Sequence, residues 1–137
     1  MGLDIGTRRI GVAISDGIGL TAQPLETVKV DAKGGHIARI AALCKEHDVQ
    51  ELVVGIPYEF DGGEGLMARK VRKVLAAVAG ATGLTAHEVD ERLTTRQAER
   101  VLIDADVSRR KRKEVIDQLA AALILQSWMD GRRTAER

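Results

Sequence analysis

An acidic residue near the start of the chain stands in a segment that is otherwise apolar. Asp4 lies within GLDIGTRRIGVAISD, where short apolar runs are typical of buried strands. An aspartate at the end of a strand usually belongs to a turn or a helix cap, but Asp4 precedes Ile5 and Gly6 inside the apolar element. A charge in such a place costs free energy unless a partner compensates it, so Asp4 is a candidate for chemistry.

Two groups of basic residues could bind phosphate. Arg8 and Arg9 follow Asp4 in a predicted turn, where they are either solvated or placed to grip a phosphate. The segment SRRKRKE holds a dense basic run made up of Arg109, Arg110, Lys111, Arg112 and Lys113. Cations at the start of a helix oppose its dipole, which favours acidic residues there. We therefore expect this run to track a phosphate backbone, with a solvated helix start as the alternative.

The strands that would position these residues can be located from their apolar runs. Runs bounded by glycine and other turn residues predict strands in GLDI, RIGVAIS, PLETVKV, ELVVGI and LTAHEVDE. The first three follow one another as an antiparallel meander, whereas the later ones alternate with helices and need right-handed parallel crossovers. We therefore expect an α/β fold with a mixed five-stranded sheet in the order 3-2-1-4-5 and helices on its faces.

Helical spacing of apolar residues completes the pattern. It predicts helices around residues 37–44, 71–78, 98–105 and 111–129. In the last helix the residues expected to face inward are Val115, Ile116, Leu119, Leu123 and Ile124. We expect one domain over residues 1–130, followed by a polar C-terminal tail over residues 131–137.

Composition limits the setting of the protein. The chain of 137 residues has 21 Lys and Arg against 20 Asp and Glu, so any basic surface for nucleic acid must be local. A single cysteine, Cys44, excludes an internal disulfide framework. No apolar run approaches the roughly 18 residues of a membrane span, and no secretory signal pattern precedes the first strand. We therefore expect a cytoplasmic protein with no membrane partner.

Four motifs occur in a fixed order, namely GLDIGTRRIGVAISD, GIP with DGGEG, VDERLTT and IDQLAAALILQ. Their order and separations resemble the YqgF family of small bacterial proteins, and the resemblance extends from Gly2 to about Asp130. It implies a ribonuclease H-like fold. It also implies a nuclease that processes the precursor of 16S ribosomal RNA or, as an alternative, resolves Holliday junctions in DNA.

The resemblance implies a set of acidic residues around metal ions, at Asp4, Glu91 and Asp117. In-line hydrolysis of a phosphodiester is helped by two divalent cations about 3.5–4 Å apart. Hard cations such as Mg²⁺ are held by carboxylates, water and substrate phosphate, and the histidines of this chain share no ligand spacing. We therefore expect Mg²⁺ or Mn²⁺, with two ions bound.

The predicted topology is consistent with this set. Asp4 and Glu91 fall near the ends of parallel strands, which meet at the carboxyl edge where open α/β sheets place their sites. Asp117 precedes a run of three alanines, whose small side chains allow a helix to approach the sheet closely. Asp90 is a rival to Glu91, because side chains alternate along a strand and only one of the two can face the site. The resemblance favours Glu91.

Two further residues beside Glu91 are expected to contact nucleic acid. Arg92 could bind a phosphate, and Thr95 could do the same, although Thr95 is equally suited to capping a helix. Aromatic residues make up only 2% of the chain, so stacking on unpaired bases is poorly provided for. Recognition should depend on the phosphate backbone and on shape.

Other functional classes stay open at this point. A non-catalytic RNA-binding or ribosome-binding module could share the fold. The segment DIGTRR also resembles the phosphate loop of actin-like kinases, but those enzymes need two such domains and this chain supplies one. The expected partner is a structured RNA precursor or branched DNA. The protein is expected to be a monomer or a homodimer, and a resolvase that cuts two symmetric strands would act as a dimer.

Overall fold

A single mixed sheet organises the part of the chain that the structure describes. The structure is a computed structural model that describes residues 1–57, 65–90 and 109–136, with side chains in the last segment described for residues 112–132. The strands are β1 (Gly2–Ile5), β2 (Arg9–Ser15), β3 (Ala22–Lys29), β4 (Glu51–Ile56) and β5 (Thr85–Asp90). They are arranged in the order β3-β2-β1-β4-β5, which confirms the predicted order.

The directions of the strands decide which ends lie together. β1 pairs antiparallel with β2 and parallel with β4, β4 pairs parallel with β5, and β2 pairs antiparallel with β3. The three parallel strands therefore end at one edge of the sheet, where β2 begins. We call this the carboxyl edge, and it includes the ends of β1, β4 and β5 and the turn between β1 and β2.

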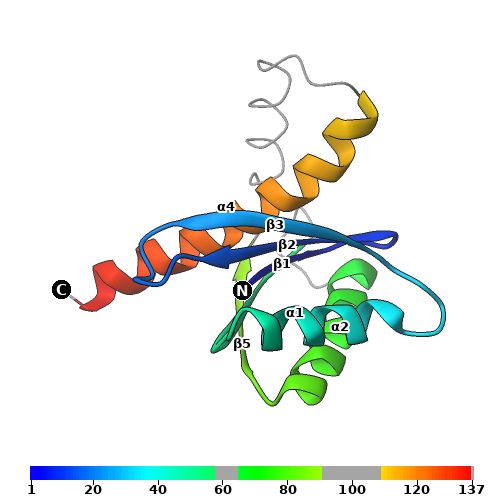
Figure 1. The fold of residues 1–137 in the computed structure, drawn as a ribbon, viewed down its shortest axis with the longest axis horizontal. Helices are drawn as coiled ribbons and strands as arrows, with labels where there is room; N and C mark the ends of the chain where they lie inside the picture. Colours follow the sequence, from blue (N-terminus) through cyan, green and yellow to red (C-terminus); the bar gives the residue numbers. More distant parts are fainter. Residues whose placement is uncertain (58–64, 91–108, 137) are drawn as a thin grey trace.

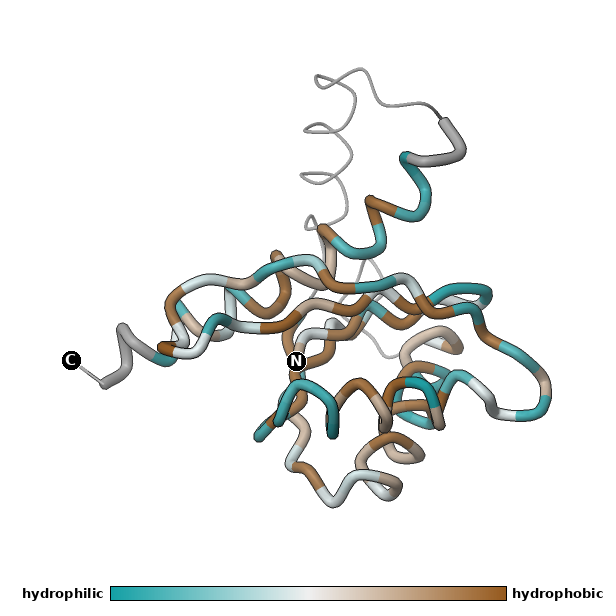
Figure 2. Tube along the Cα trace, viewed as in Figure 1, coloured by the Kyte–Doolittle hydropathy of each residue, from teal (hydrophilic) through white to brown (hydrophobic). Residues whose placement is uncertain are grey.

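Helices cover both faces of the sheet (Figure 1). The helices α1 (Gly35–Glu46) and α2 (Leu66–Thr82) pack on one face, and α4 (Arg109–Glu136) crosses the other face over β1, β2, β3 and β4. The larger hydrophobic core lies under α1 and α2 and includes Leu3, Ile10 and Leu52. Figure 2 shows the hydrophobic residues of the strands between these two layers of helix.

Alternation along β1 assigns its side chains to the two faces. Leu3 and Ile5 are buried in the core under α1 and α2. Gly2 and Asp4 therefore face α4, because successive side chains of a strand point to opposite faces. No helix in the described part of the chain is long and apolar enough to cross a membrane.

The buried face of α4 differs from the predicted one. Its buried residues are Ala120, Ala121, Ala122, Ile124, Leu125 and Met129. Of the residues expected to face inward, only Ile124 is fully buried, whereas Val115, Ile116, Leu119 and Leu123 are half-buried. Around residues 115–123 the alanines form the contact, since the helix lies close to the sheet there, whereas Ile124, Leu125 and Met129 are buried further along the helix.

The ends of the elements mostly follow the predicted signals. β4 has the predicted bounds, and α2 ends at Thr82, directly before Gly83, where a φ of 72° favours glycine. α4 runs on to Glu136, past the predicted end at residue 129, because residues 130–136 contain no proline that would stop it. The predicted helix at 98–105 lies outside the described residues.

Candidate functional site

Asp4 brings a carboxylate to the carboxyl edge of the sheet. It lies one residue before the end of β1, is half-buried, and faces the side covered by α4. Its ladder partner on β2 is Gly11. The adjacent apolar residues fix its orientation, because a shift of one residue would expose Leu3 and Ile5 to α4 and bury the charge in the larger core.

Asp117 lies directly over this pair of strands. A Cβ atom added to Gly11 would overlap the backbone carbonyl group of Asp117, so α4 touches β2 at this glycine. One helical turn further along, a Cβ atom on Gly2 would lie 2.6 Å from the carbonyl oxygen of Ala121. Opposed residues of antiparallel strands have Cα atoms about 4.5–5.5 Å apart, so Asp4 and Asp117 flank Gly11 as close neighbours.

Arg9 forms an ion pair with Asp117. The Nε atom of Arg9 lies 2.6 Å from Oδ2 of Asp117, and the two side chains are 34% and 17% exposed. Arg9 and Gly11 lie two residues apart on β2 and therefore share the face covered by α4. A hydrogen bond between two charged groups at this distance is stronger than a neutral one. The guanidinium of Arg9 thus supplies a positive charge within the predicted site.

Arg8 lies in the turn between β1 and β2, and Arg9 is the first residue of β2, so the two arginines have different surroundings. The N–H of Gly6 donates to the carbonyl oxygen of Arg9 at 2.9 Å, and a Cβ atom on Gly6 would lie 2.8 Å from that oxygen. The turn therefore requires glycine at this position. Arg8 is exposed in the turn, and its carbonyl oxygen accepts from the N–H of Val30 at 2.9 Å. Arg8 faces solvent, whereas Arg9 faces the carboxylate.

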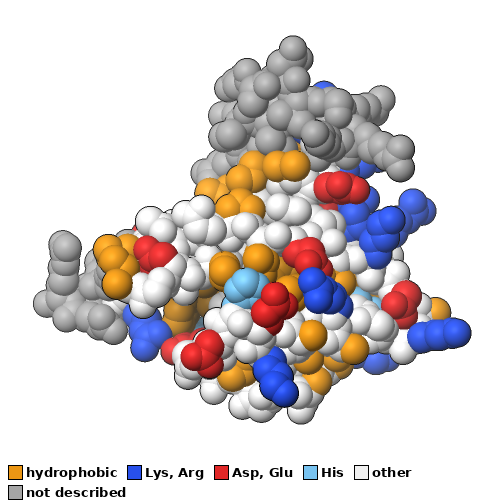
Figure 3. Space-filling view, in the orientation of Figure 1, with side chains coloured by type: hydrophobic (Ala, Val, Ile, Leu, Met, Phe, Trp, Pro, Cys, Tyr) orange, Lys and Arg blue, Asp and Glu red, His pale blue; other side chains and the backbone are white. Residues whose placement is uncertain are grey.

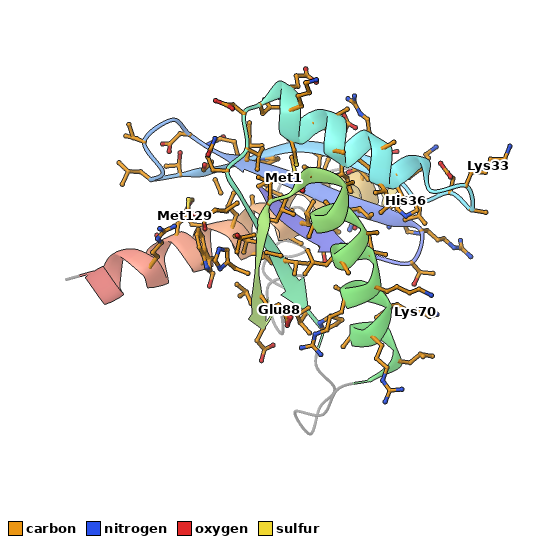
Figure 4. All side chains as sticks on the ribbon, turned by 90° about the horizontal axis from the view of Figure 1, so that it is seen from below. Met1, Lys33, His36, Lys70, Glu88 and Met129 are labelled. Atoms are coloured by element: carbon orange, nitrogen blue, oxygen red, sulfur yellow. The ribbon has the colours of Figure 1, made fainter. Side chains whose placement is uncertain are left out.

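The register of β5 bears on the choice between Asp90 and Glu91. Glu88 lies on the face of α2, where its Oε1 is 2.9 Å from Nη2 of Arg72, and Figure 4 labels it on β5 beside that helix. Asp90 shares this face by alternation and lies in register with Ile56, away from the face of Asp4. Glu91, Arg92 and Thr95 lie outside the described residues, so their predicted roles stay predictions.

The basic run forms the start of α4. Lys113 is exposed and Arg112 is half-buried, while the side chains of Arg109, Arg110 and Lys111 lie outside the described set. Arg112 and Lys113 lie about one turn before Asp117 on the same helix. The last two members of the run therefore lie on the helix that carries Asp117, and the role of the run in binding phosphate stays a prediction.

Two polar residues that the sequence did not single out hold this part of α4 on the sheet. The hydroxyl of Thr27 on β3 donates to the carbonyl oxygen of Glu114 at 2.8 Å. The same hydroxyl accepts from Nε2 of Gln118 at 3.1 Å. These bonds flank Asp117 in the helix and join residues 87 and 91 positions apart in the chain. No local pattern could have indicated them.

The described residues supply some of the ligands that a hard divalent cation needs. Among the described residues, no group of three His, Cys, Asp or Glu side chains is close enough to hold a metal ion. Asp4 and Asp117 supply two carboxylates on one face, and Glu91, the third predicted ligand, is not described. The guanidinium of Arg9 already occupies a cation position beside Asp117. This donor set, oxygen only, suits Mg²⁺ or Mn²⁺.

Among the described residues, the cavities found are not lined by Asp4, Arg9 or Asp117. A cavity of about 760 Å³ opens at the opposite edge of the sheet, between the β2–β3 turn, the start of β4 and the end of α4. Its lining includes Ile18, Trp128 and Arg132. Small-molecule sites are usually the largest apolar pockets, whereas a nucleic-acid backbone binds to an open charged surface.

Two curated proteins of similar sequence match almost the whole chain. A protein of Myxococcus xanthus is 49% identical over 133 residues, which cover 97% of this chain and 88% of that protein. A protein of Lactococcus lactis is 47% identical over 132 residues, which cover 95% of this chain and 92% of that protein. Both carry the name "Putative pre-16S rRNA nuclease".

Solved structures share the fold at low sequence identity. Thermus thermophilus RuvC in complex with a Holliday junction substrate superposes with a TM-score of 0.57 at 20% identity, covering 96% of this chain and 93% of that chain. The fowlpox virus resolvase, bound to Holliday junction DNA, gives a TM-score of 0.55 at 12% identity, covering 96% of both chains. These likenesses and the strand order confirm the predicted ribonuclease H-like fold.

A family model matches nearly the whole chain. The model described as "RuvX: Holliday junction resolvase" matches residues 1–131, which include β1, the turn with Arg9, and the helix that carries Asp117. The predicted resemblance to the YqgF family is confirmed by this match and by relatives of nearly half identical sequence. The chain belongs to the RuvX family.

Proposed function

We propose that this protein is a divalent-metal-dependent nuclease that hydrolyses phosphodiester bonds in the precursor of 16S ribosomal RNA. The observation that carries the proposal is the placement of Asp4 and Asp117 on either side of Gly11 at the carboxyl edge. The RNA substrate is supported by the names of relatives that are 47% and 49% identical over almost the whole chain.

In this proposal Asp4, Glu91 and Asp117 hold Mg²⁺ or Mn²⁺, with two ions in the complete site. Divalent ions activate a water molecule as the nucleophile and stabilise the leaving oxygen of an in-line displacement. Asp4 is supplied by the central strand of the sheet and Asp117 by a helix in contact with that sheet. Both carboxylates are therefore presented on rigid elements, which keeps their oxygen atoms in place as the phosphate binds.

Basic residues around these carboxylates would bind the substrate backbone. Arg8 is exposed in the turn next to Asp4, and Lys113 is exposed on the helix that carries Asp117. Figure 3 shows Lys and Arg side chains gathered on the side where this turn lies in Figure 1. Contacts to phosphate give affinity without sequence specificity, so the shape of the RNA would select the cleavage position.

A four-way DNA junction is the second candidate substrate. The family model is described by resolvase activity, and this description favours branched DNA independently of the names of the relatives. A resolvase cuts two strands related by symmetry and would act as a homodimer, whereas trimming of an RNA precursor needs only a monomer. The two candidates therefore differ in the oligomeric state expected on the substrate.

The test offers both substrates to the purified protein with Mn²⁺ and compares the wild type with Asp4→Asn. We expect cleavage of a 16S precursor fragment by the wild type and at least a hundredfold loss in the variant. Asp48→Asn is the matched control, because Asp48 is exposed at a φ of 54°, which asparagine also adopts. Circular dichroism checks that all proteins fold.

Each outcome decides between the candidates. Cleavage of the junction without cleavage of the precursor would move the substrate assignment to DNA. Metal-independent binding of RNA with no cleavage under any condition would favour a non-catalytic module. Undiminished cleavage by Asp4→Asn would contradict the proposed site itself.

A further inference from the structure

We infer that Arg9 is a resident counter-cation for Asp117, which holds this carboxylate in place and competes with the divalent ion for it. This inference rests on the proposed function only in taking Asp117 as a metal ligand. Arg9 had been expected, together with Arg8, to contact nucleic acid. That role stays a prediction, and the structure gives the two arginines different surroundings.

The geometry of the pair supports a specific contact. The Nε–H of Arg9 donates to Oδ2 of Asp117 at 2.6 Å, and the contact joins residues 108 positions apart in the chain. Asp117 is 17% exposed and Arg9 is 34% exposed, so water screens this pair less than it screens an exposed pair. Arg39 and Glu26 form such an exposed pair, with side chains 47% and 32% exposed.

The backbone brings the two residues of this contact close together. Asp117 is fixed along the strand by the touch of its carbonyl group on Gly11, and Arg9 lies two residues before that glycine on the same face. The carbonyl oxygen of Arg9 is held by the N–H of Gly6. Backbone contacts thus place Arg9 on the sheet next to Asp117 on the helix that covers it.

The charges indicate what the contact does. The Asp117 carboxylate is largely buried, and the guanidinium of Arg9 compensates its charge when no divalent ion is bound. The same positive charge repels a divalent cation and occupies one oxygen that the cation could use. Arg9 therefore stabilises the fold around Asp117 in the absence of metal, and weakens metal binding to this carboxylate.

The test measures Mn²⁺ binding by calorimetry and thermal unfolding in EDTA for the full chain, the wild type beside Arg9→Gln. We expect the variant to bind Mn²⁺ about three- to tenfold more tightly and to unfold at a lower temperature in EDTA. Saturating Mn²⁺ should remove most of that difference in unfolding temperature. Arg9→Lys, which keeps the charge, should bind Mn²⁺ like the wild type.

Two further variants separate this role from general effects. Arg39→Gln breaks the exposed pair with Glu26 and should leave Mn²⁺ binding unchanged. In an Asp117→Asn background, replacing Arg9 by Gln should no longer change the unfolding temperature, because the carboxylate that it compensates is absent. A persistent effect in that background would show that Arg9 stabilises the turn and not the carboxylate, which would overturn the inference.

Unchanged or weaker Mn²⁺ binding by a folded Arg9→Gln protein would also overturn it. If Arg9 gripped a substrate phosphate instead, the variant would raise KM for the substrate with kcat and Mn²⁺ binding unchanged. None of the binding and unfolding measurements needs a cleavable substrate. A protein that binds Mn²⁺ as described but cleaves neither RNA nor DNA would contradict the proposed function and leave the role of Arg9 standing.

Discussion

The backbone of Asp117 fills the space that a side chain at Gly11 would occupy, so the missing side chain of Gly11 is what lets α4 reach the sheet beside Asp4. This contact couples the packing of α4 on the sheet to the position of Asp117. A residue without chemistry of its own sets the distance between two carboxylates on different elements. Packing at Gly11 should therefore matter for activity as well as for stability.

Replacement of Gly11 by alanine tests this relationship. The added methyl group would overlap the backbone of α4, which cannot move aside as a flexible side chain would. We expect a loss of about 1–3 kcal/mol in the free energy of unfolding, measured with urea, together with a large fall in kcat. Gly17→Ala is the control, because a Cβ atom there meets open space, and it should stay within about 0.5 kcal/mol. Wild-type cleavage by Gly11→Ala would show that the approach of α4 does not position Asp117.

Neutralising exposed cations near the site should weaken binding in a way that depends on salt. We expect Arg8→Gln and Lys113→Gln each to lower the slope of log affinity against log salt concentration by about 0.7–0.9, one phosphate contact each, with kcat unchanged. Lys45→Gln changes an exposed lysine at the end of α1, near the opposite edge of the sheet, and should leave the slope unchanged. Equal slopes for all proteins, measured by fluorescence anisotropy, would remove these residues from the interface.

The hydroxyl of Thr27 should matter for the orientation of α4. Thr27→Val keeps the shape of the side chain and its preference for a strand but removes the bonds to Glu114 and Gln118. We expect a loss of about 1–2 kcal/mol in the free energy of unfolding and a lower kcat with little change in KM. Thr85→Val, at an exposed position of β5, is the control. A rise in KM with an unchanged kcat would point to a substrate contact instead.

A second charged cluster lies at the other edge of the sheet and predicts a pH dependence. The Oε2 atom of Glu51 lies 2.7 Å from Nε2 of His87, and Nη1 of Arg132 donates to Oε1 at 3.1 Å. The ring of Trp128 lies 4.8 Å from that of His87 and 5.1 Å from the guanidinium carbon of Arg132. Burial alone would raise the pKa of Glu51, but the hydrogen bonds from Arg132 and His87 lower it below 4.5.

A carboxyl group whose pKa is lower in the folded state stabilises the fold above its unfolded value and loses this effect as the pH falls. We therefore expect the wild type to unfold at a higher temperature than Glu51→Gln above pH 4.5, and the difference to shrink as the pH falls through the lowered pKa. Thermal unfolding followed between pH 3 and 7 measures this, each buffer being used for both proteins. A constant difference across that range would show that Glu51 acts by packing and not by charge.

The sequence allowed the sheet to be predicted because its signals are local. Apolar runs and turn residues locate each strand, and the meander followed by parallel crossovers favours the order β3-β2-β1-β4-β5, which the structure has. The close approach of α4 could also be expected from its alanines. The glycines that receive it, Gly2 and Gly11, become understandable only when β1 and β2 are paired.

Contacts between distant segments could not be predicted in this way. The pair of Arg9 with Asp117 depends on which side of the turn each arginine faces, and a residue count does not decide this. The predicted inward face of α4 was wrong at Val115, Ile116, Leu119 and Leu123, because large apolar residues are the usual guide, whereas here three alanines and Ile124, Leu125 and Met129 are buried. The cluster of Glu51, His87 and Trp128 joins three elements and has no motif.

The most direct test of the account is a crystal of the protein soaked with Mn²⁺ and measured at the manganese absorption edge. The account predicts an anomalous peak that lies about 2.0–2.3 Å from a carboxylate oxygen of Asp4 and from one of Asp117, with Arg9 moved off Oδ2. A peak elsewhere, or none between these two residues in a protein that cleaves its substrate with Mn²⁺, would contradict it.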